Sequence, residues 1–407
     1  MTGKLGHAPR YDVTIIGDGP GGALSALALA SRGVRVAMIG SGRPVPNRIV
    51  SIPRNAVAAL GEIGLGDWLR NNGTPLRRRV SNWEGSVADL KMEVGSVLVD
   101  HKELLSATHK LAAMNGAVFL NRQCFVRRED VCAGRIAAPA SGTDASIDIT
   151  SEFIIDATGR GTTLGKSQVR LGRPLIAVEA QIRTSLPPGS MAFLVARSHW
   201  VWVAARKRDV CQATIFLPKG SFDRTFGTFL RQALAPIELD VDYVEWENCT
   251  VTDASFRLGP GQEDEWHLPV GNSIAAVDPI LSSGWYLAAI SALQSAVSIY
   301  TALSKPTQRE VANWFYRLSM ARIRDHLERS CSELYALRKG FGGIWEKQAH
   351  DFENDRRERG THRAHKLIQE TLLHSGYIPI IKGNTVEAIE LEAGNLDVTP
   401  ENAPVFD

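Results

Sequence analysis

Hydrophobic residues recur at strand-like spacing in some stretches of the chain and at helical spacing in others, which predicts strands and helices within one mixed fold. Residues 13–16 are β-branched and apolar, which is typical of a buried parallel strand. Residues 23–31 are rich in alanine and leucine and predict a helix, and residues 34–39 predict a second strand. A strand, a helix and a strand in this order predict a parallel βαβ unit at the start of the chain.

The same two periods divide the rest of the chain. Helical spacing predicts helices over residues 53–69, 100–115, 222–235, 285–303 and 307–339. Extended, β-rich patterns predict strands over residues 79–83, 91–99, 117–126, 151–156, 175–183, 191–196, 200–205, 211–217 and 240–256.

A glycine-rich turn joins the first strand to the first helix. In the sequence Gly17-Asp-Gly19-Pro20-Gly21-Gly22, Gly17 permits the tight turn and Gly19 lets a pyrophosphate approach the backbone. Gly22 lets the helix and the strand pack closely, and the helix start directs its free amides at the phosphates. The turn predicts dinucleotide binding, and the alternative is a glycine-rich turn in another α/β fold.

Composition narrows the class of protein. The 407 residues suffice for two domains, and a formal net charge of +2 gives no reason to expect nucleic acid. Five scattered cysteines without a CxxC pair favour a reducing, cytoplasmic location and argue against a metal site. The first ten residues have no apolar stretch, so we expect no secretory signal. The apolar segment 274–303 contains Asp278, Pro279 and several serines, which favours a buried helix over a membrane span.

Three motifs in a fixed order carry a family resemblance. They are the Gly17–Gly22 turn, the strand end Ile155-Asp156-Ala157-Thr158-Gly159, and Val270-Gly271-Asn272 leading to Asp278-Pro279. Together they resemble the flavin-dependent monooxygenases of the aromatic hydroxylase fold over roughly residues 10–340. Asp278-Pro279-Ile280-Leu281-Ser282-Ser283-Gly284 and Trp200-Val201-Trp202 resemble the flavin-dependent halogenase branch of the same superfamily.

The resemblance implies an α/β fold with three parts. A Rossmann-like FAD-binding domain would comprise residues 10–75, 100–173 and 265–305. A β-sheet substrate domain would comprise residues 76–99 and 174–264, and residues 306–407 would form a helical C-terminal region with a flexible tail.

The cofactor implied by the resemblance is FAD. Ser282, Ser283 and Gly284 open a helix whose positive end would face the negative edge of reduced flavin, although a plain helix cap is the simpler alternative. The resemblance implies these FAD-binding residues: Gly17, Gly19, Pro20, Gly21, Gly22, Ser41, Arg43, Arg48, Asp156, Gly159, Asn272, Asp278, Ser282, Ser283 and Gly284.

Two positions depart from the family pattern. An acidic residue that binds the adenosine ribose usually follows the second strand, and here that position is Gly40. Ser41 or Arg43 would substitute, and because Arg43 also suits a 2′-phosphate, NADP is an alternative for this site. Asn272 stands where the pattern has an aspartate, and it can hydrogen-bond a ribityl hydroxyl without charge.

A third departure concerns the reaction. The halogenases use a lysine between the first and second motifs to handle hypohalous acid, and this chain has no lysine between residues 50 and 80. Lys91 and Lys102 come next, and we interpret both as solvated charges. The sequence therefore predicts oxygenation rather than halogenation. No nicotinamide-binding domain is visible, so electrons would come from NAD(P)H or a partner flavin reductase.

The resemblance implies an FAD-dependent monooxygenase that adds oxygen from O₂ to an aromatic ring. The combination of features is most similar to flavoproteins that hydroxylate a tryptophan of a partner protein to build a tryptophylquinone, as in quinohemoprotein amine dehydrogenase maturation. Arg77–Arg79 and Arg356–Arg359 are basic runs able to meet an acidic partner. Trp200, Trp202 and Pro279 are the candidates for lining the substrate cavity, with a core aromatic pair as the alternative for the tryptophans.

Three other functions stay open from the sequence. A small-molecule aromatic hydroxylase or a flavin-dependent halogenase would share the same motifs. A non-catalytic flavin-binding partner protein would need no reaction cavity.

Overall fold

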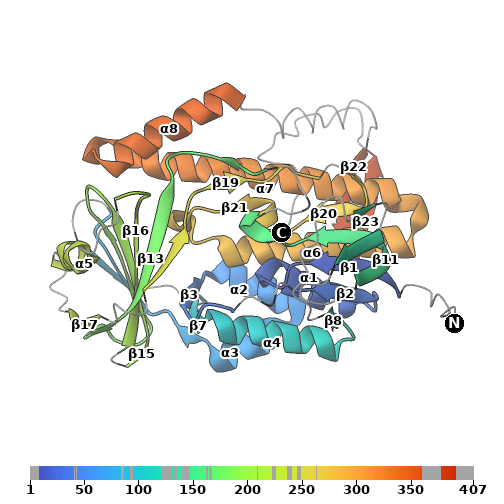
Figure 1. Ribbon diagram of the computed structural model, residues 1–407, viewed down its shortest axis with the longest axis horizontal. Coiled ribbons are helices and arrows are strands. Elements are labelled where there is room, and N and C mark those ends of the chain that lie inside the picture. Colours follow the sequence, from blue (N-terminus) through green and yellow to red (C-terminus); the bar gives the residue numbers. More distant parts are fainter. Residues whose placement is uncertain are drawn as a thin grey trace.

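The structure is a computed structural model with one α/β body that carries a sheet domain at one end (Figure 1). It describes residues 9–40, 42, 44–83, 87–91, 95–120, 131–132, 135–139, 146–161, 164, 167–208, 210–221, 226–235, 241–244, 249–262, 264–359 and 377–390.

The first sheet contains the predicted βαβ unit. At its centre β1 (Arg10–Ile16) lies parallel to β2 (Val36–Ile39) and to β11 (Ser146–Asp156). Parallel strands end at the same edge, so the ends of β1 and β11 lie side by side, with Ile16 paired to Asp156. The full order is β8-β2-β1-β11-β10-β9 with β20 beside β11; the further strands are β8 Val118–Leu120, β9 Val131–Cys132, β10 Arg135–Pro139 and β20 His267–Pro269.

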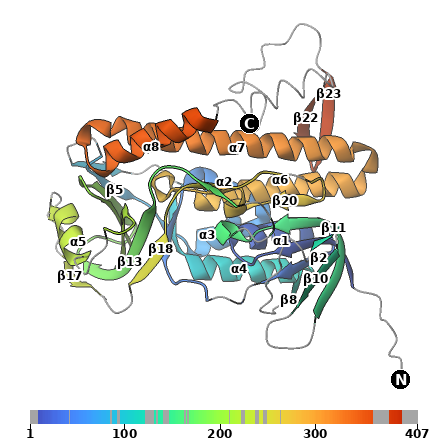
Figure 2. The same cartoon turned by 45° about the horizontal axis from the view of Figure 1, so that its top comes forward.

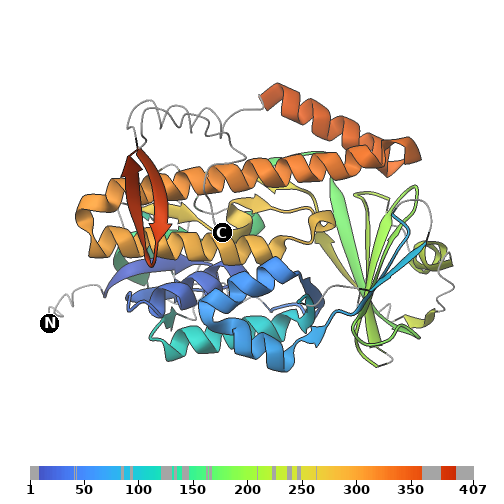
Figure 3. The same cartoon turned by 180° about the vertical axis from the view of Figure 1, so that it is seen from behind.

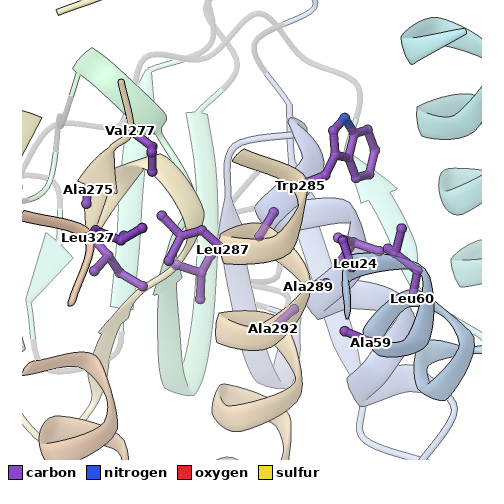
Figure 4. Close-up of a cluster of buried hydrophobic side chains, with 14 of the residues drawn as sticks. Leu24, Ala59, Leu60, Ala275, Val277, Trp285, Leu287, Ala289, Ala292 and Leu327 are labelled. Carbon is purple, nitrogen blue, oxygen red and sulfur yellow. The ribbon is translucent and has the colours of Figure 1, made fainter. Parts of the chain in front are cut away.

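Helix α6 (Gly284–Ser304) is the central element of the core. It packs against α1 (Pro20–Ala30) and α2 (Arg54–Leu60), and Figure 4 shows Leu287 on its other side, toward Leu327 and Val277. α6 is the one described helix long and apolar enough to cross a membrane, but 72% of its apolar window is buried, as in a core helix. The same body contains the helices α3 Gly66–Asn72, after a π-helical turn Gly61–Leu65, and α4 His101–Met114.

The second sheet forms the other end of the molecule (Figures 1 and 2). Its order is β17-β13-β16-β15-β14-β5-β6, with β18 beside β13. Helix α5 (Phe226–Leu234) covers one face. The strands are β5 Arg78–Ser81, β6 Ala88–Lys91, β13 Leu175–Thr184, β14 Ser190–Val195, β15 Trp200–Lys207, β16 Val210–Pro218, β17 Val241–Val244 and β18 Thr250–Asp253.

Two small sheets connect the large ones. The first contains β3 Ile49–Ile52, β4 Thr74–Pro75 and β7 Val97–Asp100 in the order β3-β7-β4. The second contains β12 Val169–Arg170, β19 Arg257–Leu258 and β21 Ala275–Ala276 in the order β12-β19-β21.

The C-terminal region packs along the rest of the protein. Helix α7 (Arg309–Leu337) runs the length of the molecule, and α8 (Ile344–Arg359) folds back over it (Figures 2 and 3). The Tyr316 hydroxyl of α7 donates to the carbonyl of Pro269, and the Trp345 indole of α8 donates to the carbonyl of Ala196 at 2.8 Å. α7 and α8 therefore contact both large sheets.

Most predicted helices are confirmed, including those over 53–69, 100–115, 285–303 and 307–339. The predicted strand over 91–99 is wrong, because β6 and β7 belong to different sheets on either side of Gly95, whose φ is 127°. The region 306–407 was expected to be helical, but it also contains a hairpin of β22 (Tyr377–Lys382) and β23 (Thr385–Glu390). The predicted strand over 117–126 is described only as far as β8.

Replacing Leu287 with alanine should destabilise the whole fold. Its side chain, in the first turn of α6, is 1% exposed, so the substitution should lower the free energy of unfolding by about 2–5 kcal/mol, measured by denaturant titration. Leu337→Ala is the matched control, because that leucine is 73% exposed and its loss should cost under about 0.5 kcal/mol. Equal effects of the two variants would contradict the central role of α6.

Candidate flavin-binding and active site

The glycine turn after β1 is packed backbone against backbone. Gly17 has a φ of 113°, and a Cβ there would lie 2.2 Å from the carbonyl oxygen of Ala157. A Cβ on Gly22 would lie 2.0 Å from the carbonyl oxygen of Gly17. By contrast, no described atom lies within 4 Å of a Cβ built on Gly19. The turn is therefore closed on the protein side and open beside Gly19.

The helix that follows the turn presents unsatisfied amides. α1 begins at Pro20, and its cap residue Gly19 offers no side-chain acceptor. The first turn of α1 contains no acidic residue. An anion beside Gly19 would therefore meet free N–H groups and the positive end of the helix dipole.

Asp156 ties two of the motifs together. One carboxylate oxygen accepts hydrogen bonds from the Thr158 backbone and hydroxyl, at 3.0 and 2.6 Å, and from the Ser273 hydroxyl at 3.1 Å. Burial acts to raise the pKa of Asp156, but the His267 ring 3.7 Å away and the Thr158 bonds outweigh it and lower the pKa. The Ser273 hydroxyl also accepts from the amide of Gly159. Asp156 thus holds together two loops, one containing Gly159 and the other containing Asn272.

The start of α6 is the second open helix end. Ser282 has a left-handed φ of 50°, which is strained for a residue with a side chain. The Ser283 hydroxyl donates to the carbonyl of Leu281 and does not cap the helix. Ser282 and Gly284 are exposed, and no described atom lies within 4 Å of a Cβ on Gly284. The first amides of α6 are therefore available to a negatively charged group.

Asp278, just before this turn, bonds to the protein itself. Its carboxylate is fully buried and accepts from the Ile280 amide at 3.0 Å and from the Tyr335 hydroxyl at 2.9 Å. Burial raises the pKa of Asp278 to about 6. The contacts make Asp278 the residue that connects the turn to α7.

One face of the second sheet is polar near its centre. In the strand register Glu179 pairs with Thr214, and Trp202 pairs with Thr214 from the other side. Directly paired residues point to the same face, which also carries Gln212 and Phe193. The opposite face is apolar beneath α5, where Val178, Ile182, Val201, Val203 and Ile215 pack.

The segment before β3 reaches this polar face. The Arg48 guanidinium lies 3.4 Å from Glu179, and the amide of Ile49 donates to the Gln212 side chain. His101, at the start of α4, packs edge-on against Trp285 of α6, with ring centroids 5.5 Å apart. Burial, and secondarily the charge of Arg48, lowers the pKa of His101 to about 3, so its ring is neutral. Within the described part of the chain, Arg48 Nε and His101 Nδ1 are buried without a hydrogen-bond partner.

Comparison with known proteins identifies an FAD-binding domain in this chain. The FAD binding domain family model matches residues 10–168. A brominase of 1H-pyrrole-2-carbonyl-[peptidyl-carrier protein] from Pseudoalteromonas luteoviolacea (strain 2ta16) is 23% identical over 331 residues, which cover 72% of this chain and 78% of the brominase. Residues 10–168 therefore form an FAD-binding domain, and the chain is a flavoprotein.

Solved structures of flavin-dependent enzymes share the fold. The peptidyl tryptophan dihydroxylase QhpG, which is essential for tryptophylquinone cofactor biogenesis, has a TM-score of 0.66 at 18% identity, over 93% of this chain and 86% of that chain. The flavin-dependent halogenase CmlS has a TM-score of 0.69 at 16% identity, over 91% of this chain and 71% of that chain. At these identities the likeness establishes the fold.

FAD, the cofactor of this flavoprotein, fits the described residues. The open space beside Gly19 and the free amides of α1 suit its pyrophosphate. The exposed start of α6 suits the negative edge of the reduced ring system, and the unpartnered Arg48 Nε and His101 Nδ1 are buried donors or acceptors nearby in the fold. When bound, FAD supplies the redox and oxygen chemistry, and the protein supplies position and electrostatics.

The other predicted site residues fall into four groups. Asn272 is exposed, and its backbone carbonyl accepts from Gln168 at 2.6 Å. Trp200 is 1% exposed and stacks on Phe216 with ring centroids 3.6 Å apart, so its ring belongs to the aromatic core. Trp202 and Pro279 are partly exposed. Ser41 and Arg43 lie outside the described residues.

Sequence reasoning missed two residues of the polar face, Glu179 and Gln212, and also His101 beside it. Glu179 and Gln212 each have apolar neighbours in their strands, a pattern that signals a buried polar function. His101 directly follows Asp100, which caps α4 with its carboxylate accepting from the Glu103 amide at 2.9 Å. The His101 ring instead turns inward to Trp285.

Gly19→Val should abolish FAD binding without unfolding the protein. Residue 19 has an extended backbone (φ −72°, ψ −175°), and a side chain there meets only open space, which the pyrophosphate requires. The flavin content of the purified variant should fall below about a tenth of the parent's, while its circular dichroism is unchanged. Gly22→Ala is the contrasting variant, because its Cβ collides with backbone and should lower stability itself. Full flavin content in Gly19→Val would contradict the placement.

Proposed function

We propose that this flavoprotein hydroxylates an aromatic ring, namely a tryptophan side chain of a partner polypeptide, during tryptophylquinone biogenesis. The observation that carries the proposal is the polar face of Glu179, Gln212 and Thr214 beside Trp202, to which Arg48 adds its guanidinium. The similarity to the fold of a peptidyl tryptophan dihydroxylase over 93% of the chain supports this substrate class.

The polar face has the chemistry to hold an indole. Trp202 and Phe193, paired across β15 and β14, offer aromatic faces for stacking. Glu179 and Gln212 offer oxygen acceptors for an indole N–H. Both functions lie on the same face of one sheet, so one ring can use them together.

The reaction balances with one O₂ for each hydroxyl group. Two electrons from reduced flavin and two protons convert one oxygen atom to water, and the other oxygen replaces a ring hydrogen as hydroxyl. The first amides of α6 favour negative charge on the reduced cofactor. His101 is neutral, so its unpartnered Nδ1 can accept or donate one hydrogen bond, depending on the tautomer.

Halogenation is the second candidate, because the brominase relative matches 72% of the chain. The positions of the lysines favour hydroxylation. Lys91 is exposed on the edge strand β6, and Lys102 is exposed on α4. The brominase's name also specifies a substrate attached to a carrier protein, so a protein-bound ring is common to both relatives.

A pocket of about 770 Å³ lies where a partner chain could bind. Pro75, Leu76, Arg77, Arg78, Asp89, Lys91 and Gly95 line it, and Leu76 packs in one apolar cluster with Trp202. Arg78 pairs with Asp89 at 2.8 Å, and Arg79 lies over the Phe193 ring. Arg77 is exposed, so it is the residue of the basic run best placed to meet an acidic partner.

Labelled dioxygen tests the reaction. The enzyme, reduced by NADPH or by a flavin reductase with NADH, is given a tryptophan-containing polypeptide and isotopically labelled O₂, with and without bromide. We expect the polypeptide to gain one labelled oxygen atom per hydroxylation, read by mass spectrometry, and no halogen. A brominated product would establish halogenation. Faster turnover of free tryptophan than of the polypeptide would establish a small-molecule hydroxylase. If no ring that is tested is modified, the result would favour a non-catalytic flavin-binding protein.

Arg77→Glu tests the partner surface. The substitution should raise KM for the polypeptide on the order of threefold at low salt, because rim charges act mainly on association, and kcat should not change. The difference from the parent should vanish at high ionic strength. Arg10→Glu is the matched control, an exposed arginine at the start of β1 with the same charge change. An equal effect of Arg10→Glu would exclude a local role for Arg77.

A further inference from the structure

The end of β2 lacks the acidic side chain that dinucleotide folds place there. In such folds a carboxylate at this position binds the adenosine ribose hydroxyls. Here β2 ends at Ile39 and is followed by Gly40, which is buried. A Cβ built on Gly40 would lie 2.6 Å from Oδ2 of Asp18 and 3.0 Å from its Cγ. The carboxylate of Asp18 therefore occupies the space where a side chain of residue 40 would begin.

Two contacts hold Asp18 in this position. The amide of Gly17 donates to the carbonyl of Ile39 at 2.9 Å, which ties the glycine turn to the end of β2. The His109 ring of α4 bonds through Nε2 to the backbone carbonyl of Asp18 at 2.9 Å, and it packs edge-on against Phe119 of β8. Because a carbonyl only accepts, His109 Nε2 carries the proton in this bond. Burial lowers the pKa of His109, which keeps the ring neutral.

We propose that Asp18 supplies the carboxylate that binds the adenosine ribose of FAD, in place of the acid that is absent at position 40. A carboxylate accepts two O–H donors at once, which matches the neighbouring 2′ and 3′ hydroxyls of a ribose. Its negative charge also repels a 2′-phosphate, so the same residue selects FAD against NADP at this site. The inference needs FAD binding and does not depend on hydroxylation.

The experiment measures binding to the flavin-free full chain by quenching of flavin fluorescence. The ligands are FAD and an FAD analogue whose adenosine carries 2′-deoxyribose. In the parent, loss of the 2′-hydroxyl should raise Kd about tenfold, because it removes a hydrogen bond to a charged group. In Asp18→Asn the Kd for FAD should rise about tenfold, and the two ligands should bind with nearly equal Kd, since the partner of the 2′-hydroxyl is weakened.

A swapped acid is the rescue variant. Asp18→Ala removes the two atoms closest to a Cβ on Gly40, Oδ2 and Cγ of Asp18, and the φ of Gly40 lies outside the left-handed region, so the variant opens space for Gly40→Glu. The double variant Asp18→Ala/Gly40→Glu should regain most of the FAD affinity lost in Asp18→Ala. Gly40→Ala alone should weaken FAD binding, because its Cβ displaces the Asp18 carboxylate.

Asp12→Asn is the matched control. Asp12 lies in β1 and pairs with Arg35, so its substitution should leave both Kd values unchanged. Thermal unfolding of each flavin-free variant shows whether the turn has been disturbed more widely. The proposal is overturned if Asp18→Asn keeps the parent's FAD affinity, or if it weakens FAD and the deoxy analogue by the same factor.

Discussion

The flavin site depends on close backbone packing at the ends of β1 and β11, where there is no room for side chains. Gly17 lies against Ala157, and Gly22 lies against Gly17, with no room for a Cβ at either glycine. The amide of Ala157 donates to the backbone carbonyl of Ile16 at 2.8 Å, and the amide of Val270 donates to the backbone carbonyl of Asp156 at 2.9 Å. Three segments that are far apart in the chain thus meet at one sheet edge, and α1 can begin directly above them.

The C-terminal helices are part of this site. Tyr335 of α7 bonds to Asp278, and Asp278 begins the turn that places Ser282 in its strained left-handed conformation before α6. A buried carboxylate is costly unless it is hydrogen-bonded, so its partners are needed for the turn to persist. α7 therefore stabilises the same helix end that would face the reduced flavin.

The sequence sufficed to predict features that are local. The FAD-binding domain at the start of the chain and the helices with strong periodicity are signalled by patterns within short stretches of sequence, and they are confirmed. The polar face could not be predicted, because it depends on the register that places Glu179 opposite Thr214. Asp18 was missed for the same reason, since its proximity to Gly40 exists only when the turn is folded against β2.

For the two tryptophans of β15, the sequence pattern shows which face they occupy but not what surrounds each ring. Because side chains alternate along a strand, Trp200 and Trp202 share a face of β15. Their surroundings differ because Phe216 stacks on Trp200, whereas Thr214 is the direct neighbour of Trp202. The same strand therefore contributes one ring to the core and one to the polar face.

The balance of charge on that face bears on the kind of substrate. Arg48 and Glu179 pair with each other, and His101 is 5% exposed with a pKa lowered to about 3, so it carries no charge at neutral pH. Gln212, Thr214 and Trp202 add dipoles and aromatic surface without charge. Because the charges of Arg48 and Glu179 offset each other, the part of the face beside them binds a neutral ring at less electrostatic cost than an ion. An indole within a polypeptide is such a ring, whereas free tryptophan would bring its ammonium and carboxylate with it.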